Sequence, residues 1–242
     1  MTSLTVAVVI PAWNEAEAIG GVLSEVPPEA VRWVFVVTGA STDTTAEIAA
    51  AHGARPLAQD RPGYGAACWA GARAAVEEGA AVVAFLDGDY SDPPADLPRL
   101  LAPILDGSAD LTLGCREMDS HPHALPLHAR LGNRLVLLAL RLLVGRTVTD
   151  LPSFKAIRLS RLTQLRMQEM TYGWTVELIV KSLRAGLRVA EVPVAYRPRR
   201  GGRSKVSGTV RGTAGAAWKL TTCAVRYARW SPPPLPAISP TI

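Results

Sequence analysis

Residues 82–94 read Val-Val-Ala-Phe-Leu-Asp-Gly-Asp-Tyr-Ser-Asp-Pro-Pro, an apolar run that is followed at once by three carboxylates within six residues. The run 82–86 has the length and composition of a buried strand. Carboxylates this close repel one another unless a cation lies among them, and Mg²⁺ or Mn²⁺ commonly binds one or two carboxylates together with phosphate oxygens. The segment is equally consistent with a turn that caps the next helix, so both interpretations stay open at this point.

Similar apolar runs alternate with stretches of helical length through the first half of the chain. Strands are expected at 6–10, 33–37, 82–86 and 111–113, and helices at 16–26, 43–52, 64–78 and 95–105. This alternation predicts an α/β fold with a mostly parallel central sheet and helices on both faces. Ligands bind such sheets at the carboxyl ends of the strands, so the loops that follow strands are the candidate site.

The second half has a different pattern. Residues 130–144 combine a leucine-dense face with Arg130, Arg134 and Arg141, which indicates either a core helix or a helix lying on a membrane surface. A helix over 173–184, a strand over 188–196 and a basic helix over 209–229 are also expected. The proline-rich residues 231–242 are predicted to be a disordered tail.

Composition narrows the class of protein. The chain has 242 residues, of which 48% are hydrophobic and 19% charged, which argues against intrinsic disorder. Three widely spaced cysteines exclude a disulfide scaffold and suit the reducing cytoplasm. We expect no signal peptide, because the chain enters an apolar strand directly, and no run reaches the roughly 18 apolar residues of a membrane span. The prediction is a cytoplasmic protein, soluble or peripheral at the inner face of the membrane.

The net charge of +5 is unevenly distributed. Residues 1–191 carry 17 basic and 21 acidic side chains, whereas residues 192–242 carry 9 basic side chains and no acidic one. A basic end on a mildly acidic body is typical of a protein that meets phosphates, nucleic acid or an anionic membrane, and it is also consistent with a solvated tail.

Two further segments carry candidate binding residues. After the first apolar run comes Pro11-Ala-Trp-Asn-Glu15, in which Trp13 suits stacking on a base, and Asn14 or Glu15 suits hydrogen bonding to the base or a ribose. The alternative is a helix-entry loop that Asn14 caps. Residues 197–208 read Arg-Pro-Arg-Arg-Gly-Gly-Arg-Ser-Lys-Val-Ser-Gly, with glycines for close approach and donors for phosphate. Alone, this second segment also fits a nucleic-acid patch.

Taken in order, these blocks resemble the family 2 glycosyltransferases of the GT-A fold, in particular the polyprenol-phosphate sugar synthases related to dolichol-phosphate mannose synthase. The resemblance runs through about residues 6–228 and includes GYGAACWAGARAA from Gly63, LGCRE, HARLGNRLVLLALRLLVG, TDLPSFKAIR and TYGWTVELIVK. It implies one Rossmann-like domain over 1–230, with a nucleotide-binding half (1–115), an acceptor-binding half with a closing loop (116–208) and a basic C-terminal helix (209–230).

The resemblance also implies roles for individual residues on the donor side. The donor is a hexose linked to GDP or UDP, and Mg²⁺ or Mn²⁺ is the cofactor. Asp89 is the expected principal metal ligand, Asp87 assists the metal or the ribose, and Ser91 is a weaker third ligand. The expected nucleotide contacts are Pro11, Trp13, Asn14, Glu15, Thr38, Asp87 and Gly88, and Arg203, Ser204 and Lys205 of a mobile closing loop hold the diphosphate.

On the acceptor side, Arg116, Arg130, Asp150 and Glu177 are expected to face the sugar or the acceptor phosphate. The implied reaction is a single displacement with inversion at the anomeric carbon. A polyprenyl phosphate is the favoured acceptor, and being anionic it needs no strong base. The hydroxyl of a small soluble acceptor is the alternative, and a carboxylate such as Asp150 would then take the proton. Nucleic acid is not an expected partner.

One segment departs from the family pattern. The family carries an acid after the second strand that reads the base, and here Thr38 stands in its place. Weaker or altered base recognition is therefore expected, and a catalytically silent nucleotide-sugar-binding protein is the alternative of another class. A nucleotidyltransferase is disfavoured, because the segment PAWNEAE is not the glycine-rich loop that such enzymes place after the first strand.

Overall fold

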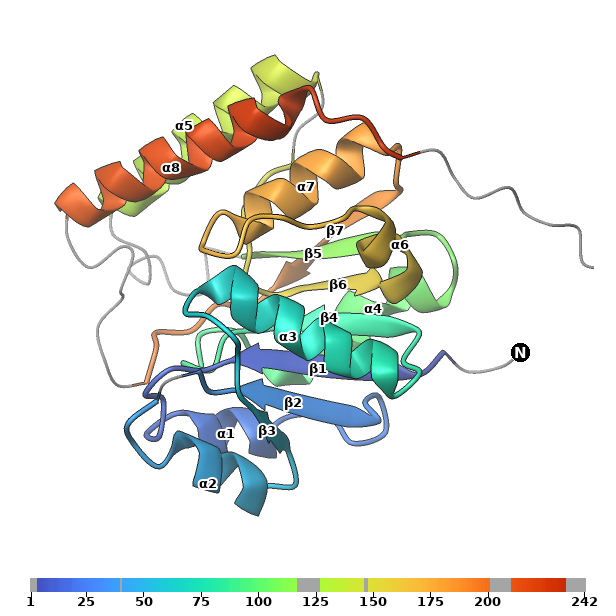
Figure 1. Cartoon of the computed structure of the whole chain (residues 1–242), viewed down its shortest axis with the longest axis vertical. Helices are drawn as coiled ribbons and strands as arrows, with labels where there is room; N and C mark the ends of the chain where they lie inside the picture. The colour runs from blue at the N-terminus through green and yellow to red at the C-terminus, as the bar shows by residue number, and fades with distance from the viewer. Residues whose placement is uncertain (1–3, 40, 117–126, 146–147, 201–209, 234–242) are drawn as a thin grey trace, which may run out of the picture.

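A computed structural model of the chain describes residues 4–39, 41–116, 127–145, 148–200 and 210–233. These residues form a seven-stranded sheet in the order β3-β2-β1-β4-β6-β5-β7 (Figure 1). The strands are β1 (Val6–Pro11), β2 (Trp33–Val37), β3 (Arg55–Leu57), β4 (Val82–Phe85), β5 (Leu111–Arg116), β6 (Lys155–Arg158) and β7 (Val189–Val194). Strand β6 runs antiparallel to β4 and β5, and the other paired strands are parallel, which confirms the predicted mostly parallel sheet.

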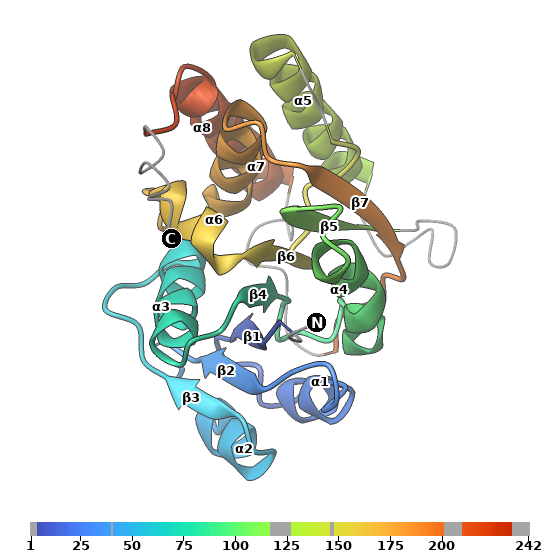
Figure 2. The ribbon, with the colours of Figure 1, turned by 90° about the vertical axis from the view of Figure 1, so that its right-hand side faces the viewer.

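Helices cover both faces of the sheet, as predicted. Seen along the sheet, α3, α6 and α7 lie on one face, and α1 and α4 lie on the other (Figure 2). The helices are α1 (Ile19–Ser24), α2 (Thr45–Ala51), α3 (Tyr64–Glu77), α4 (Leu97–Leu105), α5 (Leu127–Val144), α6 (Leu159–Gln164), α7 (Trp174–Arg184) and α8 (Val210–Ala228). A short 3-10 turn, η1 (Pro94–Asp96), leads into α4.

Each face of the sheet has its own apolar core, because successive side chains of a strand point to opposite faces. In β1, Ala7 and Val9 join the core under α3 and α7, whereas Val8 and Ile10 join the core under α1 and α4. Helix α3 lies very close to β1, since a Cβ added at Gly71 would lie 2.3 Å from a methyl carbon of Val9. This close packing fixes the strand end that carries Trp13.

A third core lies away from the sheet, where α5 and α8 pack along each other and over α7 (Figure 1). It includes Val136 and Leu140 of α5, Val180 of α7, and Ala224 and Tyr227 of α8. Helix α5 therefore packs into a core on one side, which agrees with the predicted interpretation of this segment as a core helix.

The structure adds three elements to the predicted ones: β3, β6 and α6. Strand β3 is a three-residue edge strand with an exposed proline, and β6 opens with a lysine, so neither has the apolar run by which buried strands are recognised. Helix α1 starts at Ile19 and not at the predicted residue 16, because residues 16–18 form a turn in which the N–H of Ala18 donates to the Glu15 carbonyl at 2.9 Å. Among the described residues, no helix has the length and apolarity needed to traverse a bilayer.

Candidate functional site

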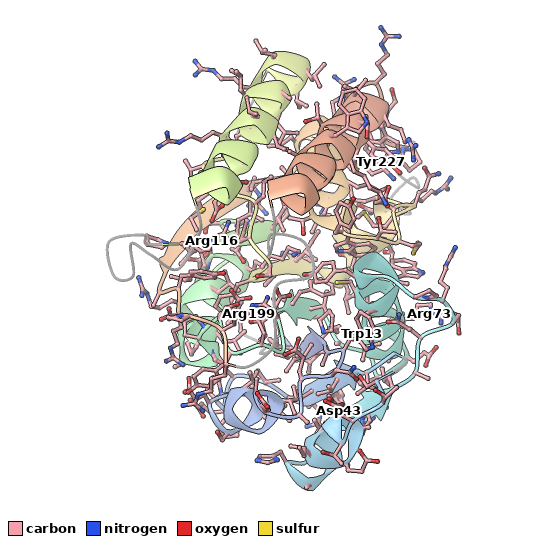
Figure 3. The ribbon with its side chains drawn as sticks, turned by 90° about the vertical axis from the view of Figure 1, so that its left-hand side faces the viewer. Trp13, Asp43, Arg73, Arg116, Arg199 and Tyr227 are labelled. Carbon is pink, nitrogen blue, oxygen red and sulfur yellow. The ribbon has the colours of Figure 1, made fainter. Side chains whose placement is uncertain are left out.

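A cavity of about 540 Å³ lies at the carboxyl ends of β1, β2 and β4, where ligands bind in sheets of this kind. Figure 3 looks onto this side of the molecule and labels Trp13 and Arg199 there. The cavity is lined by residues of seven segments: Pro11, Ala12, Trp13, Glu15, Val37, Thr38, Gly39, Gln59, Pro62, Gly63, Tyr64, Ala67, Asp87, Gly88, Asp89, Thr171, Tyr172, Arg199 and Ala216. Seven of the predicted donor-site residues thus line one cavity, namely Pro11, Trp13, Glu15, Thr38, Asp87, Gly88 and Asp89.

The loop after β1 is tied to the loop after β2. Asn14 adopts a left-handed backbone with φ 55°, and its side-chain oxygen accepts the N–H of Thr42 at 2.8 Å. The backbone N–H of Asn14 donates to the Ser41 hydroxyl at 3.1 Å, and that of Glu15 donates to Thr45 Oγ1 at 2.9 Å. Asn14 is not among the residues that line the cavity. The structure places it as a brace between two loops, and Trp13, 53% exposed, projects beside it.

Thr38 stands at the position of the missing acid, with Gly39 and Gln59 beside it in the cavity wall. Thr38 lines the cavity beside Gly39, whose φ of +57° suits a glycine. A Cβ at Gly39 would lie 3.1 Å from the amide carbon of Gln59, so the Gln59 amide rests against this backbone. Gln59 was not predicted from sequence, because it follows the short strand β3, which carries no recognisable pattern.

The acidic loop after β4 separates its three carboxylates. Asp87 and Asp89 line the cavity, and Gly88 allows the loop to pass Ala12, since a Cβ there would lie 3.0 Å from the Ala12 Cβ. The Asp92 carboxylate is buried, where it accepts the N–H of Asp87 at 3.1 Å and the hydroxyl of Ser153 at 2.7 Å. Two of the three carboxylates therefore line the cavity and the third shapes the turn, and the metal assignment stays a prediction.

Ser91, predicted as a third metal ligand, is buried and is not among the lining residues. Its backbone N–H donates to Asp89 Oδ1 at 2.9 Å, and its carbonyl accepts the N–H of Arg197 at 3.0 Å. These two backbone contacts use Ser91 to fix the loop rather than to face the cavity.

Burial and mutual repulsion change the pKa values of two carboxylates in the acidic loop. Burial, together with the nearby Asp92 and Asp89, raises the pKa of Asp87 well above its usual range, and burial raises the pKa of Asp92 to about 6. Lys155 of β6 lies fully buried in the core beside this cluster, and burial lowers its pKa. The Lys155 ammonium donates to the Ser153 carbonyl at 2.9 Å and to the hydroxyl of Tyr64, a cavity residue, at 3.3 Å. Lys155 was missed because lysine side chains are usually exposed.

The chain after β7 runs over the acidic loop and supplies a cation. The Arg199 guanidinium donates to Asp89 Oδ2, and the backbone N–H of Arg200 donates to the Asp89 carbonyl at 2.9 Å. This is the beginning of the predicted closing segment. Its remaining residues, with Arg203, Ser204 and Lys205, lie outside the described residues.

The side chains that line the cavity provide only part of a ligand set for a divalent cation. Within the described ranges, no group of three or more His, Cys, Asp or Glu side chains is arranged to hold a metal. Asp89 does hold a positive group, the Arg199 guanidinium, as its counter-ion. One or two carboxylates at a cavity wall match Mg²⁺ or Mn²⁺ that takes its other ligands from substrate phosphates and water.

The predicted acceptor residues Arg116 and Asp150 form a paired unit. Arg116 donates to both carboxylate oxygens of Asp150, at 2.7 and 2.6 Å, and Asn133 of α5 donates to the same carboxylate at 2.8 Å. The Tyr196 ring lies 5.2 Å from the Arg116 guanidinium. Burial alone would raise the pKa of Asp150, but the hydrogen bonds and charge of Arg116 hold that pKa below its usual value. A carboxylate held ionised in this way is a weak proton acceptor. Arg130 belongs to α5, and its side chain lies outside the described residues.

The prediction that Glu177 faces the sugar or the acceptor is wrong. Glu177 is 0% exposed, and its carboxylate accepts the N–H groups of Gln168 and Glu169 at 2.8 and 2.6 Å. Its ion-pair partner is the equally buried Lys181, one turn further along α7, at 2.6 Å. The carboxylate thereby caps the loop that carries Thr171 and Tyr172 into the cavity wall.

Helix α8 completes the cavity from the far side. Ala216 is a lining residue, and the Lys219 ammonium lies 4.6 Å from the centre of the Tyr172 ring. Further along the same region, Tyr227 and Trp230 place their rings 4.9 and 5.2 Å from the Lys181 ammonium. The α5–α8 region and the cavity therefore share one wall.

Comparisons with known proteins agree with this arrangement. The family model "Glycosyl transferase family 2" matches residues 7–158. The chain is 40% identical over 223 residues to an uncharacterized glycosyltransferase of Mycobacterium tuberculosis, covering 91% of this chain and 99% of that protein. It is 31% identical over 229 residues to the undecaprenyl-phosphate mannosyltransferase of Micrococcus luteus, covering 87% and 91%. Among solved structures, the glucosyl-3-phosphoglycerate synthase of M. tuberculosis in complex with Mn²⁺, UDP and phosphoglyceric acid superposes with a TM-score of 0.75 at 25% identity, covering 96% of this chain and 80% of that one.

Proposed function

The chain belongs to glycosyl transferase family 2, and from this membership we propose that it moves a hexose from a nucleoside-diphosphate sugar to the phosphate of a polyprenyl phosphate, with inversion. The observation that carries the proposal is the cavity at the carboxyl ends of β1, β2 and β4. Its walls offer an aromatic ring on which a base can stack and two carboxylates that can hold a metal ion. They also offer an arginine that can pair with the negative charge of a diphosphate. A solved structure of similar fold contains UDP and Mn²⁺.

Base recognition is assigned to the group around Thr38. Trp13 provides a stacking surface, and the Thr38 hydroxyl and Gln59 amide provide neutral hydrogen-bonding groups at the position where the family has an acid. An amide both donates and accepts, so it suits the alternating donors and acceptors of a base edge. We therefore propose that Gln59 takes over part of the role of the missing acid.

Diphosphate binding is assigned to the acidic loop. Asp89 is the proposed principal ligand of Mg²⁺ or Mn²⁺, with Asp87 assisting, and Ser91 is left out of the ligand set because it does not line the cavity. A bound divalent ion neutralises the charge that develops on the departing diphosphate. Asp89 and Asp87 would hold the ion at the strand end, and Arg199 adds a donor to the diphosphate on the open side of the cavity.

The acceptor assignment rests first on the state of Asp150. A hydroxyl acceptor must lose a proton, and Asp150, paired to Arg116 and with a lowered pKa, is poorly suited to take it. A phosphate monoester is already an anion and attacks without that help. We propose that Asp150 is a positioning residue, which holds Arg116 toward the acceptor phosphate.

The helical region gives the second argument for a lipid acceptor. Helix α5 exposes Leu135, Leu138 and Leu142 on one stripe, with Leu142 77% exposed, and Arg134 and Arg141 are also exposed. Helix α8 exposes Trp218 to 74%. Large apolar side chains flanked by cations suit the boundary between acyl chains and anionic headgroups. We propose peripheral association of the α5–α8 region with the cytoplasmic face of the membrane.

A small soluble acceptor is the second candidate, and a specific finding favours it: the solved structure cited above contains phosphoglyceric acid. The deciding experiment incubates the protein with Mn²⁺ and UDP-glucose or GDP-mannose, with either short-chain polyprenyl phosphate or 3-phosphoglycerate. Release of nucleoside diphosphate and a radiolabelled lipid product are measured, with Asp89→Asn as the control. A lipid product from wild type alone supports the proposal. A sugar–phosphoglycerate product without lipid product rejects the acceptor, and no transfer across both donors and acceptors rejects the activity.

A further inference from the structure

Both oxygens of the Asp89 carboxylate already have partners in the described structure. Oδ1 accepts the N–H of Ser91 at 2.9 Å, and Oδ2 receives the Arg199 guanidinium. The Asp89 side chain is 5% exposed, and that of Arg199 is 34% exposed. Arg199 thus lies over the carboxylate on the cavity side, in the direction from which a cation would approach.

The position of Arg199 is imposed by its neighbours. On one side, the backbone N–H of Arg197 donates to the Ser91 carbonyl at 3.0 Å, and the Arg197 guanidinium donates to Glu25 of α1's C-cap at 2.8 Å. On the other side, the N–H of Arg200 donates to the Asp89 carbonyl at 2.9 Å. Residues 197–200 are therefore anchored to the acidic loop both before and after Arg199.

A tyrosine in the acidic loop adds to this anchoring. The guanidinium groups of Arg200 and Arg197 lie 4.3 and 5.0 Å from the centre of the Tyr90 ring, and the Tyr90 hydroxyl donates to Glu25. Tyr90 has a left-handed backbone, with φ 72°, which is uncommon for an aromatic residue. The arrangement holds residues 197–200 in place through groups other than the Arg199–Asp89 pair itself.

From this geometry, and resting on the proposed function, we propose that Arg199 pairs with Asp89 until metal and donor bind. Arg199 then leaves Asp89 and pairs with the donor diphosphate. A guanidinium and a divalent ion repel each other, so Asp89 cannot hold both at contact distance. Arg199 lines the same cavity as Asp87 and Gly88, and an arriving diphosphate is an anion within its reach. Metal alone must displace Arg199 without compensation, whereas metal with diphosphate offers the guanidinium a new partner.

The exchange predicts that removal of the Arg199 side chain changes the affinity for metal alone and the affinity for UDP in opposite directions. If the pair is closed in about nine molecules of ten, it lowers the apparent affinity for metal alone about tenfold, because only the open fraction binds. Removing the Arg199 side chain should therefore strengthen binding of Mn²⁺ alone. The same change removes a donor to the diphosphate, so it should weaken binding of UDP in saturating Mn²⁺. A residue with a merely structural role would weaken both.

The experiment measures free Mn²⁺ by electron paramagnetic resonance, without nucleotide, and UDP binding by calorimetry at saturating Mn²⁺. The variants are Arg199→Ala, Arg134→Ala as a matched loss of one arginine charge at an exposed residue that does not line the cavity, and Asp89→Asn. We expect about tenfold tighter Mn²⁺ binding and several-fold weaker UDP binding for Arg199→Ala, with Arg134→Ala close to wild type in both. Thermal unfolding verifies that each variant is folded.

The outcomes separate this proposal from the one on which it rests. Loss of Mn²⁺ binding in Asp89→Asn, with Arg199→Ala unchanged or weaker, would overturn the exchange and leave the metal assignment in place. Equal gains in Arg199→Ala and Arg134→Ala would also overturn it, since they would reflect net charge alone. Mn²⁺ binding that is insensitive to Asp89→Asn would reject the metal assignment itself, and the exchange with it.

Discussion

The donor cavity and the α5–α8 region are built on different principles. The cavity takes its side chains from the ends of parallel strands, where short loops are tied to one another by backbone hydrogen bonds such as those of Asn14 and Ser91. The α5–α8 region has its own core and turns large apolar side chains outward. The comparison shows how one chain serves a water-soluble donor and a proposed lipid acceptor: the first through placed polar groups, the second through an amphipathic surface.

The buried pair Glu177–Lys181 connects the two regions, so breaking it should give the largest effect. Lys181→Met leaves the Glu177 carboxylate without its cation at a site that is 0% exposed, which costs about 3–5 kcal/mol of the free energy of unfolding. Denaturant unfolding measures the loss. Arg184→Met, at the exposed end of α7, is the control and should change stability by less than about 1 kcal/mol.

The donor side alone is broken by Asp89→Asn. Removal of a carboxylate that would hold the divalent ion should lower the rate of transfer by about 10²–10³-fold. Initial rates with saturating Mn²⁺ measure the effect. Asp106→Asn, remote from the cavity, should retain wild-type rates. Full activity of Asp89→Asn would remove this carboxylate from the proposed reaction.

The acceptor side alone is broken by Leu138→Gln with Leu142→Gln. Both side chains are exposed, so the fold should be unaffected, whereas insertion of a leucine into lipid is worth up to about 1.5–3 kcal/mol. We expect transfer to vesicle-bound polyprenyl phosphate to fall about tenfold or more, while UDP binding stays constant. Equal loss in both measurements would mean that the two regions are not separable. Unchanged transfer would contradict the membrane-facing role.

The smallest expected effect is on stability and concerns Asp150, which accepts a hydrogen bond from Asn133 of α5 and so lies between the two regions. The folded-state pKa of Asp150 lies below its unfolded value, because Arg116 outweighs the effect of burial. Its stabilisation, on the order of 1 kcal/mol, is therefore present above about pH 4 and is lost as the pH falls through the folded pKa. Asp150→Asn should be less stable than wild type at pH 7, and the two stability curves should converge in acid. Parallel curves would contradict the assignment.

The sequence predicted five of the seven described strands and most of the residues that line the cavity, because both depend on local order: an apolar run, then a polar loop. Trp13, Thr38 and Asp89 each follow a strand directly, and parallel strands bring such loops together. The roles of Asn14 and Ser91 were not predictable in this way. Their contacts are made across loops, and nothing in the residue type distinguishes a brace from a ligand.

The error at Glu177 has another cause. Every residue from Trp174 to Leu183 is buried, so α7 has no solvent-facing side. The role of Glu177 was taken from the family resemblance. Helix periodicity could not correct it, because periodicity places charged residues on an exposed face, and that rule fails when neighbouring helices enclose the helix. The pairing of Lys155 with Tyr64 and of Arg199 with Asp89 was missed because the partners lie about ninety or more positions apart in the chain.

The wall that α8 adds to the cavity has a consequence for synthesis on the ribosome. Domains form in the order in which their segments emerge, from the N-terminus onward. Strands β1, β2 and β4, with Trp13 and Asp89, leave the ribosome long before Ala216 and Lys219. A nascent chain that ends before α8 therefore holds every described strand but lacks the cavity wall beside Tyr172. The cavity is complete only when the helix with the outward-facing Trp218 has been made, so the cavity wall and that exposed tryptophan are added at the same stage of synthesis.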